Sequence, residues 1–271
     1  MEQLHRHGIY IDETPDQRVH TIVAVLFTHI HTDHLRCEVL QYSSLYTYAS
    51  TLTCSLCPYI KYPLQVNMVY KLHTTTIDCI PFKTDHSPES IGFYFPSLDL
   101  VYIGDGRITT SYPLPASYIL YDALYENELF PSRSTEESMI TLLNAVKTTG
   151  ICYLHLPHHG TLSLLQRYQI NVRLDDSILL HPFIPRMASA LGLVCPTASF
   201  ILVGMDFPYE YIRLSSNWFH IQQKDPSIVQ YDDYDSIYRV YYTNHATSEE
   251  IKNYKKQFPA CHWLPIGSTI L

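Results

Sequence analysis

The chain has 271 residues, of which 46% are apolar and 16% charged, enough for one large domain or two smaller ones that share a core. Its longest apolar runs are too short to span a bilayer and its N-terminus lacks a basic-then-apolar signal pattern, so we expect a soluble, unsecreted protein with no membrane partner. The formal net charge of −8 argues against tight nucleic-acid binding by the surface as a whole, although divalent metals bound in a cleft add positive charge locally.

The first 121 residues contain short segments in which β-branched and aromatic residues stand between turn residues, a pattern that predicts strands. We expect these strands at residues 9–12, 21–27, 44–48, 76–81, 91–95, 100–103 and 118–121. Few helices are expected between them, and 17 prolines spread along the chain indicate tight loops between short elements.

A different pattern begins near Ser134 and predicts an inserted α/β unit. Apolar residues at helical spacing predict a helix at 136–147, followed by a strand at 151–156 and a helix at 161–169. Strand character returns after Ser199. Strands at 211–219 and 236–243 and a charged helix at 248–258, capped by Ser248, predict a return to the first sheet.

Seven cysteines is an odd number in a chain of this length, which favours reduced thiols in an intracellular compartment. Cys54 and Cys57 form a C-x-x-C pair, but a structural zinc site needs two further ligands. We therefore assign this pair no role.

Histidine and aspartate are concentrated in the segment Thr28-His29-Ile30-His31-Thr32-Asp33-His34, which follows a predicted buried strand. In extended backbone His29 and His31 lie on one face, while Asp33 and His34 lie where the chain turns into a helix. The four side chains can therefore surround one point. Imidazole combined with carboxylate favours zinc over magnesium, which prefers oxygen ligands. The segment predicts a zinc site with one or two ions per chain.

This H-x-H-x-D-H run after an apolar strand resembles the signature of the metallo-β-lactamase superfamily. Downstream, Thr84-Asp85-His86-Ser87-Pro88 resembles the His-x-Pro segment of its nuclease branch, and Ile103-Gly104-Asp105-Gly106-Arg107 resembles that branch's Gly-Asp-Phe-Arg. The resemblance implies the αββα sandwich of that superfamily. It also implies the following ligand set: His29, His31 and His86 for a first zinc, Asp33 and His34 for a second, and Asp105 as the bridge between them.

Four further segments resemble the β-CASP nucleases, and among them Artemis and the related DNA cross-link repair nucleases. They are Ile9-Tyr10-Ile11-Asp12, Tyr121-Asp122-Ala123-Leu124-Tyr125, Pro131-Ser132-Arg133, and residues 212–219 with 242–252. The resemblance implies a metallo-β-lactamase domain at 1–125 and 209–271 and an inserted small α/β β-CASP-like domain at 126–208. Some positions depart from the family pattern without removing a metal ligand: Ala123 and Leu124 replace two threonines, Glu89 replaces a glycine, and Gly106 replaces an aromatic residue.

The predicted catalytic set implied by this resemblance is Asp33, Asp105, Asp122 and His245. Asp122 is expected to orient His34 or His245, and His245 to bind the second metal or to donate a proton to the leaving oxygen.

Three further residues are expected to contact substrate. Thr243 replaces a serine that helps to hold phosphate, and Arg107 can bind an anion through two donors. His159 lies in Pro157-His158-His159-Gly160-Thr161, a run that supplies a late metal ligand in other branches of the superfamily. The expected place of this run on the cleft rim favours substrate contact or a polar turn over metal ligation.

The implied activity is zinc-dependent phosphodiester hydrolysis, in which a metal-activated hydroxide attacks the scissile phosphate. We expect a DNA nuclease, either a 5′-exonuclease or a structure-specific endonuclease, acting in DNA repair or end processing. The same resemblance implies a nuclear location and possible protein partners in repair.

An RNA-processing β-CASP endonuclease is the nearest alternative. The resemblance implies a histidine before glycine in the last motif of RNA enzymes and a valine there in DNA enzymes. Ile266-Gly267 stands in that place and favours DNA, while His262 leaves room for a shifted alignment. A third possible function is a non-catalytic nucleic-acid-binding scaffold of the same fold, but the intact set of metal ligands argues against it. A fourth is a small-ester or lactam hydrolase, which would leave Asp122 and His245 without a role.

Overall fold

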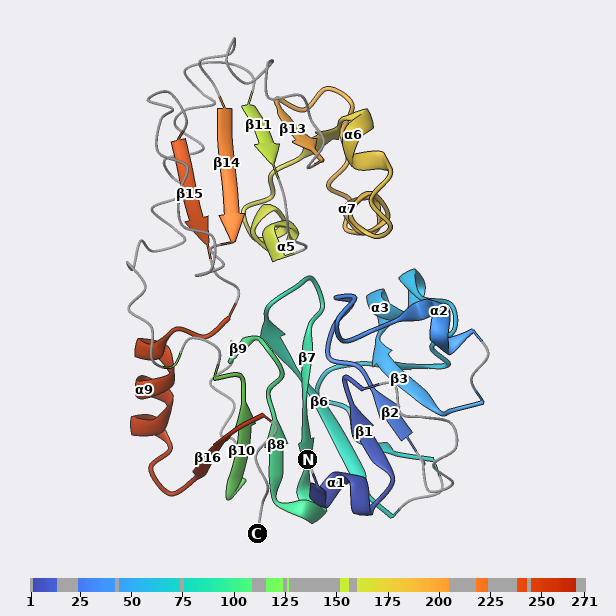
Figure 1. Ribbon diagram of the computed structural model, residues 1–271, viewed down its shortest axis with the longest axis vertical. Helices are drawn as coiled ribbons and strands as arrows, with labels where there is room; N and C mark the ends of the chain where they lie inside the picture. Colours follow the sequence, from blue (N-terminus) through green and yellow to red (C-terminus); the bar gives the residue numbers. More distant parts are fainter. Residues whose placement is uncertain are drawn as a thin grey trace. The chain divides into compact units, whose positions relative to one another are not determined.

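The computed structural model describes residues 2–13, 24–41, 44–73, 76–108, 116–123, 126, 152–155, 160–204, 218–223, 238–242 and 245–266. These residues form a mixed α/β structure with several sheets (Figure 1). The chain divides into two compact units, Met1–Phe130 with Asn244–Leu271 and Pro131–Thr243. Within the described ranges, every helix is too short or too polar to cross a membrane.

The first unit begins with a parallel four-stranded sheet in the order β1-β2-β3-β4. Its strands are β1 (Ile9–Ile11), β2 (Ala24–Leu26), β3 (Thr47–Ser50) and β4 (Tyr62–Leu64). Three short helices accompany them: α1 (Glu2–Arg6), α2 (Cys37–Leu40) and α3 (Thr51–Leu56).

The second sheet of this unit has the order β16-β10-β8-β7-β6-β5, with β9 paired to β6. Its strands are β5 (Tyr70–Lys71), β6 (Asp78–Asp85), β7 (Ile91–Phe95), β8 (Leu100–Tyr102), β9 (Arg107–Ile108), β10 (Tyr118–Tyr121) and β16 (His262–Pro265). The 3-10 turn η1 (Pro96–Leu98) joins β7 to β8. Strands β6, β7 and β8 are antiparallel, whereas β8, β10 and β16 run parallel.

Alternating side chains of the second sheet enter two different cores. Phe93 of β7 is fully buried in a cluster that also contains Ile9 of β1, so this cluster joins the two sheets. On the opposite face, Ile119 of β10 meets Ile251 of the helix α9 (Ser248–Gln257). Each such buried side chain contributes about 1.5–3 kcal/mol relative to its exposed state. The unit is therefore layered as sheet, sheet and helix.

Most predicted strands of this unit are confirmed, and β7 and β10 have the predicted bounds. Strand β6 runs past its predicted end at residue 81 as far as Asp85, because β9 supplies a pairing partner for its last two residues. The predicted helix near the C-terminus is α9, but its N-cap is Thr247 and not Ser248. Thr247 and Glu250 form a capping box, in which each side chain accepts a hydrogen bond from the other's backbone N–H.

The second unit holds a parallel five-stranded sheet in the order β12-β13-β11-β14-β15. Its elements are β11 (Cys152–His155), α5 (Gly160–Arg167), β12 (Val172–Leu174), α6 (Asp176–Leu179), α7 (Ile184–Ala190), β13 (Phe200–Val203), β14 (Trp218–Gln223) and β15 (Tyr238–Tyr242). Strand β11 and helix α5 agree with the predicted strand at 151–156 and helix at 161–169. The predicted helix at 136–147 lies outside the described residues.

Strands β14 and β15 differ from the expectation that the chain has returned to the first sheet by residue 209. Strand β14 pairs in parallel with β11, and β15 pairs with β14, so both extend the sheet of the second unit. The first unit resumes at Asn244. Alternating aromatic and apolar residues predict a strand but carry no information about which sheet it joins.

The cysteines also differ from the expectation of reduced thiols throughout, since Cys37 and Cys57 form a disulfide that ties α2 to the C-cap of α3. Their Cα atoms lie 5.8 Å apart, within the ordinary span of such a bridge. Cys54, the other member of the C-x-x-C pair, is a free thiol. Burial raises its pKa to about 11, which opposes the thiolate that redox or metal chemistry requires.

We predict that Gly92→Ala destabilises the protein by about 1–3 kcal/mol, because overpacking a dense core forces neighbouring atoms apart. A Cβ at Gly92 would collide with the ring of Phe82 and lie 2.7 Å from the carbonyl oxygen of Tyr102. Urea unfolding measures the effect. Val69→Ala, at a side chain that is 62% exposed, is the control and should stay within about 0.5 kcal/mol of wild type. Equal stability of Gly92→Ala and wild type would contradict this packing.

Candidate metal centre

The first histidine of the centre, His29, is positioned through Thr28 by the carboxylate of Asp12, which follows β1. Asp12 accepts hydrogen bonds from the backbone N–H of Thr28 at 2.8 Å and from its hydroxyl at 2.7 Å. Because that hydroxyl gives its only proton to Asp12, it accepts the 2.8 Å hydrogen bond from Nδ1 of His29. The other ring nitrogen of His29, Nε2, then carries a lone pair, as a metal ligand requires.

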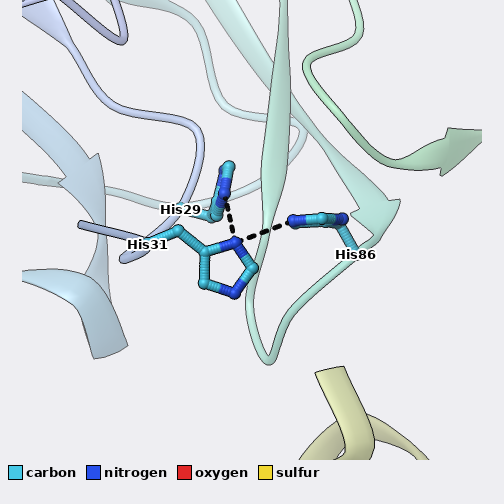
Figure 2. A group of neighbouring side chains, drawn as sticks. All are labelled: His29, His31 and His86. Atoms are coloured by element: carbon cyan, nitrogen blue, oxygen red, sulfur yellow. Dashed lines mark hydrogen bonds between the residues drawn. The ribbon is translucent and has the colours of Figure 1, made fainter. Parts of the chain in front are cut away.

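The imidazole rings of His29, His31 and His86 converge on one point, as Figure 2 shows. Nδ1 of His31 lies 2.8 Å from Nε2 of His29 and 2.9 Å from Nε2 of His86. One proton on His31 Nδ1 cannot serve both short contacts well, whereas a metal ion bound by three nitrogen lone pairs satisfies all three rings. All three residues are buried, with His31 the most exposed at 6%. The arrangement fits a metal ion.

His86 is held in place by the buried hydroxyl of Ser90. This hydroxyl accepts from the backbone N–H of His86 at 3.1 Å and donates to the carbonyl oxygen of Thr84 at 2.9 Å. The next residue, Ile91, donates its backbone N–H to the carbonyl oxygen of Thr28 at 2.9 Å. The loop that carries His86 is thereby fastened to the loop that carries His29, and Ser90 is a site-forming residue that the sequence did not single out.

Asp105 and His34 lie beside these three rings. One carboxylate oxygen of Asp105 is 2.9 Å from Nε2 of His34 and 3.9 Å from Nε2 of both His29 and His86. On the other side of the His34 ring, Nδ1 lies 3.2 Å from Asp12. Burial opposes protonation of His34, but hydrogen bonds to Asp105 and Asp12 outweigh it and raise the pKa of the imidazole to about 11. The environment around His34 therefore favours positive charge.

Two glycines allow the Asp105 loop to approach the rings. Gly104 has a φ of +75°, and a Cβ there would lie 3.0 Å from the side chain of Thr28. A Cβ at Gly106 would lie 3.0 Å from that of His86 and 3.1 Å from that of Thr84. Gly106 stands where the resembled family has an aromatic residue, and in this chain a side chain there would press against the Cβ atoms of His86 and Thr84.

His245 completes the cluster from the loop that precedes α9. Its Nδ1 lies 2.5 Å from Asp122, which follows β10, and its ring meets that of His86 edge to face at a centroid distance of 4.8 Å. Ligand atoms of His86, Asp105 and His245 lie within 4.8 Å of one another. Of the two histidines that the sequence offered as partners for Asp122, the structure pairs it with His245.

The residues predicted from the sequence differ in how closely they join this cluster. His29, His31, His34, His86, Asp105, Asp122 and His245 come together as described. Asp33 is 77% exposed, with a carboxylate oxygen 3.6 Å from Nε2 of His34, and Asp12 forms the compact group with His29 and His34 instead. Asp12 was not predicted as a site residue, although an acidic side chain directly after a buried strand is a signal for one. Thr243 and His159 lie outside the described residues.

No protein-family model matches this chain, and no curated protein matches it. One solved structure that is similar to part of it is a metallo-β-lactamase from Pontibacter korlensis, with 16% sequence identity and a TM-score of 0.26. The similarity covers 30% of this chain and 40% of that chain, so this protein spans about two fifths of the length of the structure it matches. A likeness of this size establishes neither the fold nor an activity, and the chemistry of the centre follows from its own geometry.

We predict that metal binding depends on the three converging histidines. Replacing His31 by Ala should reduce the divalent metal that copurifies with the protein to about half of the wild-type content or less, because loss of one of three ligands weakens binding severely. Elemental analysis of purified protein measures the content. His7→Ala, which removes an exposed histidine outside the cluster, should retain the wild-type content. Metal content that is the same in all three proteins would contradict the assignment.

We predict a pH-dependent contribution to stability from the pair that fastens α9 to the turn after Asp122. Lys255 Nζ donates to Glu126 at 2.6 Å and to the Tyr121 hydroxyl at 3.1 Å. The hydrogen bond from Lys255, and after it the hydrogen bond that the Tyr121 hydroxyl donates to Glu126 at 2.7 Å, lower the pKa of Glu126 below its ordinary value of 4.5. The contribution is therefore present above that value and lost as the pH falls through the lower pKa of the folded state.

Glu126→Gln should accordingly cost less than about 1 kcal/mol at pH 7, since the pair is partly exposed. Its difference from wild type in urea unfolding should shrink as the pH is lowered below 4.5. Glu249→Gln, at an exposed position in the first turn of α9, is the control and should show no such dependence. A difference that persists unchanged in acid would rule out the ion pair as its source.

Proposed function

We propose that this chain is a zinc-dependent phosphodiesterase of the metallo-β-lactamase fold with an inserted β-CASP-like unit, and that it acts as a DNA nuclease in repair or end processing. The observation that carries the proposal is the convergence of His29, His31 and His86 beside Asp105, next to a His245 that Asp122 orients. A nuclear location and protein partners in repair belong to the same proposal and rest on the sequence resemblance.

The proposed ligands for one zinc ion are the ring nitrogens of His29, His31 and His86, with Asp105 and His34 beside them for a second. When bound, zinc supplies the positive charge that lowers the pKa of a water molecule and stabilises negative charge on phosphate oxygens. The carboxylates of Asp105 and Asp12, which raise the pKa of His34, supply the negative charge that suits a metal cation, and a metal bound by His34 would replace the proton on its ring.

The residues of the chain itself prepare the centre for hydrolysis. Asp12 and Thr28 hold His29 in the tautomer that presents Nε2, and Asp122 holds Nδ1 of His245. The ring nitrogen Nε2 of His245 then has two available roles. As a neutral imidazole it binds a second metal, and as an imidazolium it donates a proton to the leaving oxygen.

The C-terminal strand supports DNA over RNA as the substrate. Strand β16 runs parallel to β10, with His262 opposite Tyr118 at the start of β10, and Ile266 donates its backbone N–H to the carbonyl oxygen of Tyr121 at 2.8 Å. Ile266 is therefore the residue next to Asp122, while His262 lies at the other end of the strand. This placement supports the alignment with isoleucine in the last motif, and the RNA enzymes of the resembled family have histidine there.

The proposal is tested by incubating the purified protein with 5′-phosphorylated single-stranded, duplex and hairpin DNA and with matching RNA. We predict digestion of DNA that requires zinc and stops with a chelator. Asp122→Asn should lower the rate by about 10–100-fold, because loss of an orienting carboxylate misplaces the imidazole it holds. Asp105→Ala should abolish digestion, Asp33→Ala tests the ligand predicted from the sequence, and His7→Ala should digest DNA like wild type.

The outcomes separate the alternatives. Digestion of RNA alone would replace the DNA nuclease by the RNA-processing endonuclease. Zinc binding without digestion of any nucleic acid would overturn the proposed activity. Digestion that survives both chelator and Asp105→Ala would show that this centre does not catalyse it.

A further inference from the structure

The guanidinium group of Arg107 lies between two carboxylates instead of facing an open surface. Arg107 begins β9 directly opposite Asp85 of β6, and its Nη2 is 3.7 Å from the Asp85 carboxylate. Its Nη1 donates to Glu250 at 3.3 Å. The side chains of Arg107 and Asp85 are only 18% and 11% exposed, so their ion pair is shielded from water, whereas Glu250 is 32% exposed.

Each of the three charged residues is close in the chain to a residue of the metal centre. Asp85 directly precedes His86, and Arg107 follows Asp105 by two residues. Glu250 is in the first turn of α9, whose N-cap Thr247 follows His245 by two residues. The second carboxylate oxygen of Glu250 accepts the backbone N–H of Thr247 at 2.8 Å. The carboxylate of Glu250 thus touches both Arg107 and the segment that carries His245.

We infer that Arg107 is a positioning residue, an inference that rests on the proposed metal-dependent function. Through Asp85 and Glu250, Arg107 joins the loops that carry His86, Asp105 and His245. The sequence predicted a phosphate-binding role for Arg107. In the structure each terminal nitrogen of the guanidinium fork faces an acidic partner, and these two carboxylates offset the charge that a phosphate would need. Asp105 and His245 come from segments far apart in the chain, and the Arg107–Glu250 contact links residues 143 positions apart.

An arginine suits this role better than a lysine would. Its planar fork presents several donors in fixed directions and can reach two carboxylates at once, whereas an ammonium group acts as a point charge. Removing the arginine would leave Asp85 and Glu250 without the cation that both contact, which is unfavourable above all for the more buried Asp85. The loops that carry His86 and His245 would then move apart, and the geometry offered to the metal would change.

The test compares Arg107→Gln, Arg107→Lys and Glu250→Gln with wild type. Glutamine at position 250 preserves the capping box with Thr247 but removes the charge that Arg107 contacts. Glu249→Gln is the matched control, since Glu249 is an exposed acidic residue in the same turn. Metal-free protein is titrated with zinc in competition with a chelator, and the absorption spectrum of the cobalt-substituted protein reports the ligand geometry.

We expect Arg107→Gln and Glu250→Gln each to lower the affinity for the more weakly bound of the two zinc ions by about 10–100-fold. This is the size of effect seen when groups that orient ligands are removed. Both substitutions should also alter the cobalt spectrum. The variant that combines Arg107→Gln with Glu250→Gln should bind metal no more weakly than either single variant, because the two residues act as a pair. Arg107→Lys should lie between wild type and Arg107→Gln, and Glu249→Gln should match wild type. On DNA, kcat should fall while KM stays unchanged.

The inference is overturned if Arg107→Gln and Glu250→Gln keep the wild-type metal affinity and cobalt spectrum. A rise in KM for Arg107→Gln alone would restore the phosphate-binding role. If Arg107→Gln fails to fold, Glu250→Gln decides the question, because its helix cap is intact. Wild-type protein that binds metal but digests no nucleic acid would overturn the proposed function and leave the metal comparison valid.

Discussion

The geometry of the metal centre depends on the contacts made by the carboxylate of Asp12. This carboxylate lies at the end of β1 and receives both polar hydrogens of Thr28, and it also faces Nδ1 of His34. The hydroxyl of Tyr102 in the second sheet lies 3.5 Å from the same carboxylate, and burial followed by the charge of Asp12 raises the pKa of that phenol. One carboxylate therefore determines the tautomer of His29, orients His34 and connects the two sheets behind the centre.

The centre requires many polar groups to be buried together, and the fold supplies local hydrogen-bond partners for several of them. A buried donor or acceptor without a partner costs about 1–3 kcal/mol. Thr28 satisfies His29, Ser90 satisfies the backbone of His86, and Asp122 satisfies His245. These partners lie at strand ends and in tight loops between strands, where side chains can converge without interrupting the hydrogen bonds of a sheet.

Helix α9 is attached to the first unit by both charged and apolar contacts. Glu250 near its start contacts Arg107, and Lys255 near its end contacts Glu126 in the turn that follows Asp122. Between them Ile251 is buried against the second sheet. Because His245 precedes this helix directly, these contacts fix the position of the late histidine relative to Asp122. A chain that leaves the first unit at residue 130 and returns at 244 needs such anchors to close the site accurately.

Local patterns in the sequence determined the elements and the nature of the centre. The alternation of apolar residues predicted β7 and β10 with their bounds. The run from His29 to His34 placed several candidate metal ligands within six consecutive residues. The separate segments around His86, Asp105, Asp122 and His245 were assigned to the same centre by resemblance, and the structure brings all four to it.

Only the tertiary structure decided which distant groups meet. It placed Asp12 beside His34 and left Asp33 largely exposed, it paired Arg107 with Asp85 and Glu250, it joined Cys37 to Cys57, and it assigned β14 and β15 to the second unit. The physical reason is that periodicity along a chain records which side of an element is buried, a property of a few neighbouring residues. The partner across a sheet, a loop or an ion pair depends on how whole elements pack, and residues 143 positions apart carry no local mark of one another.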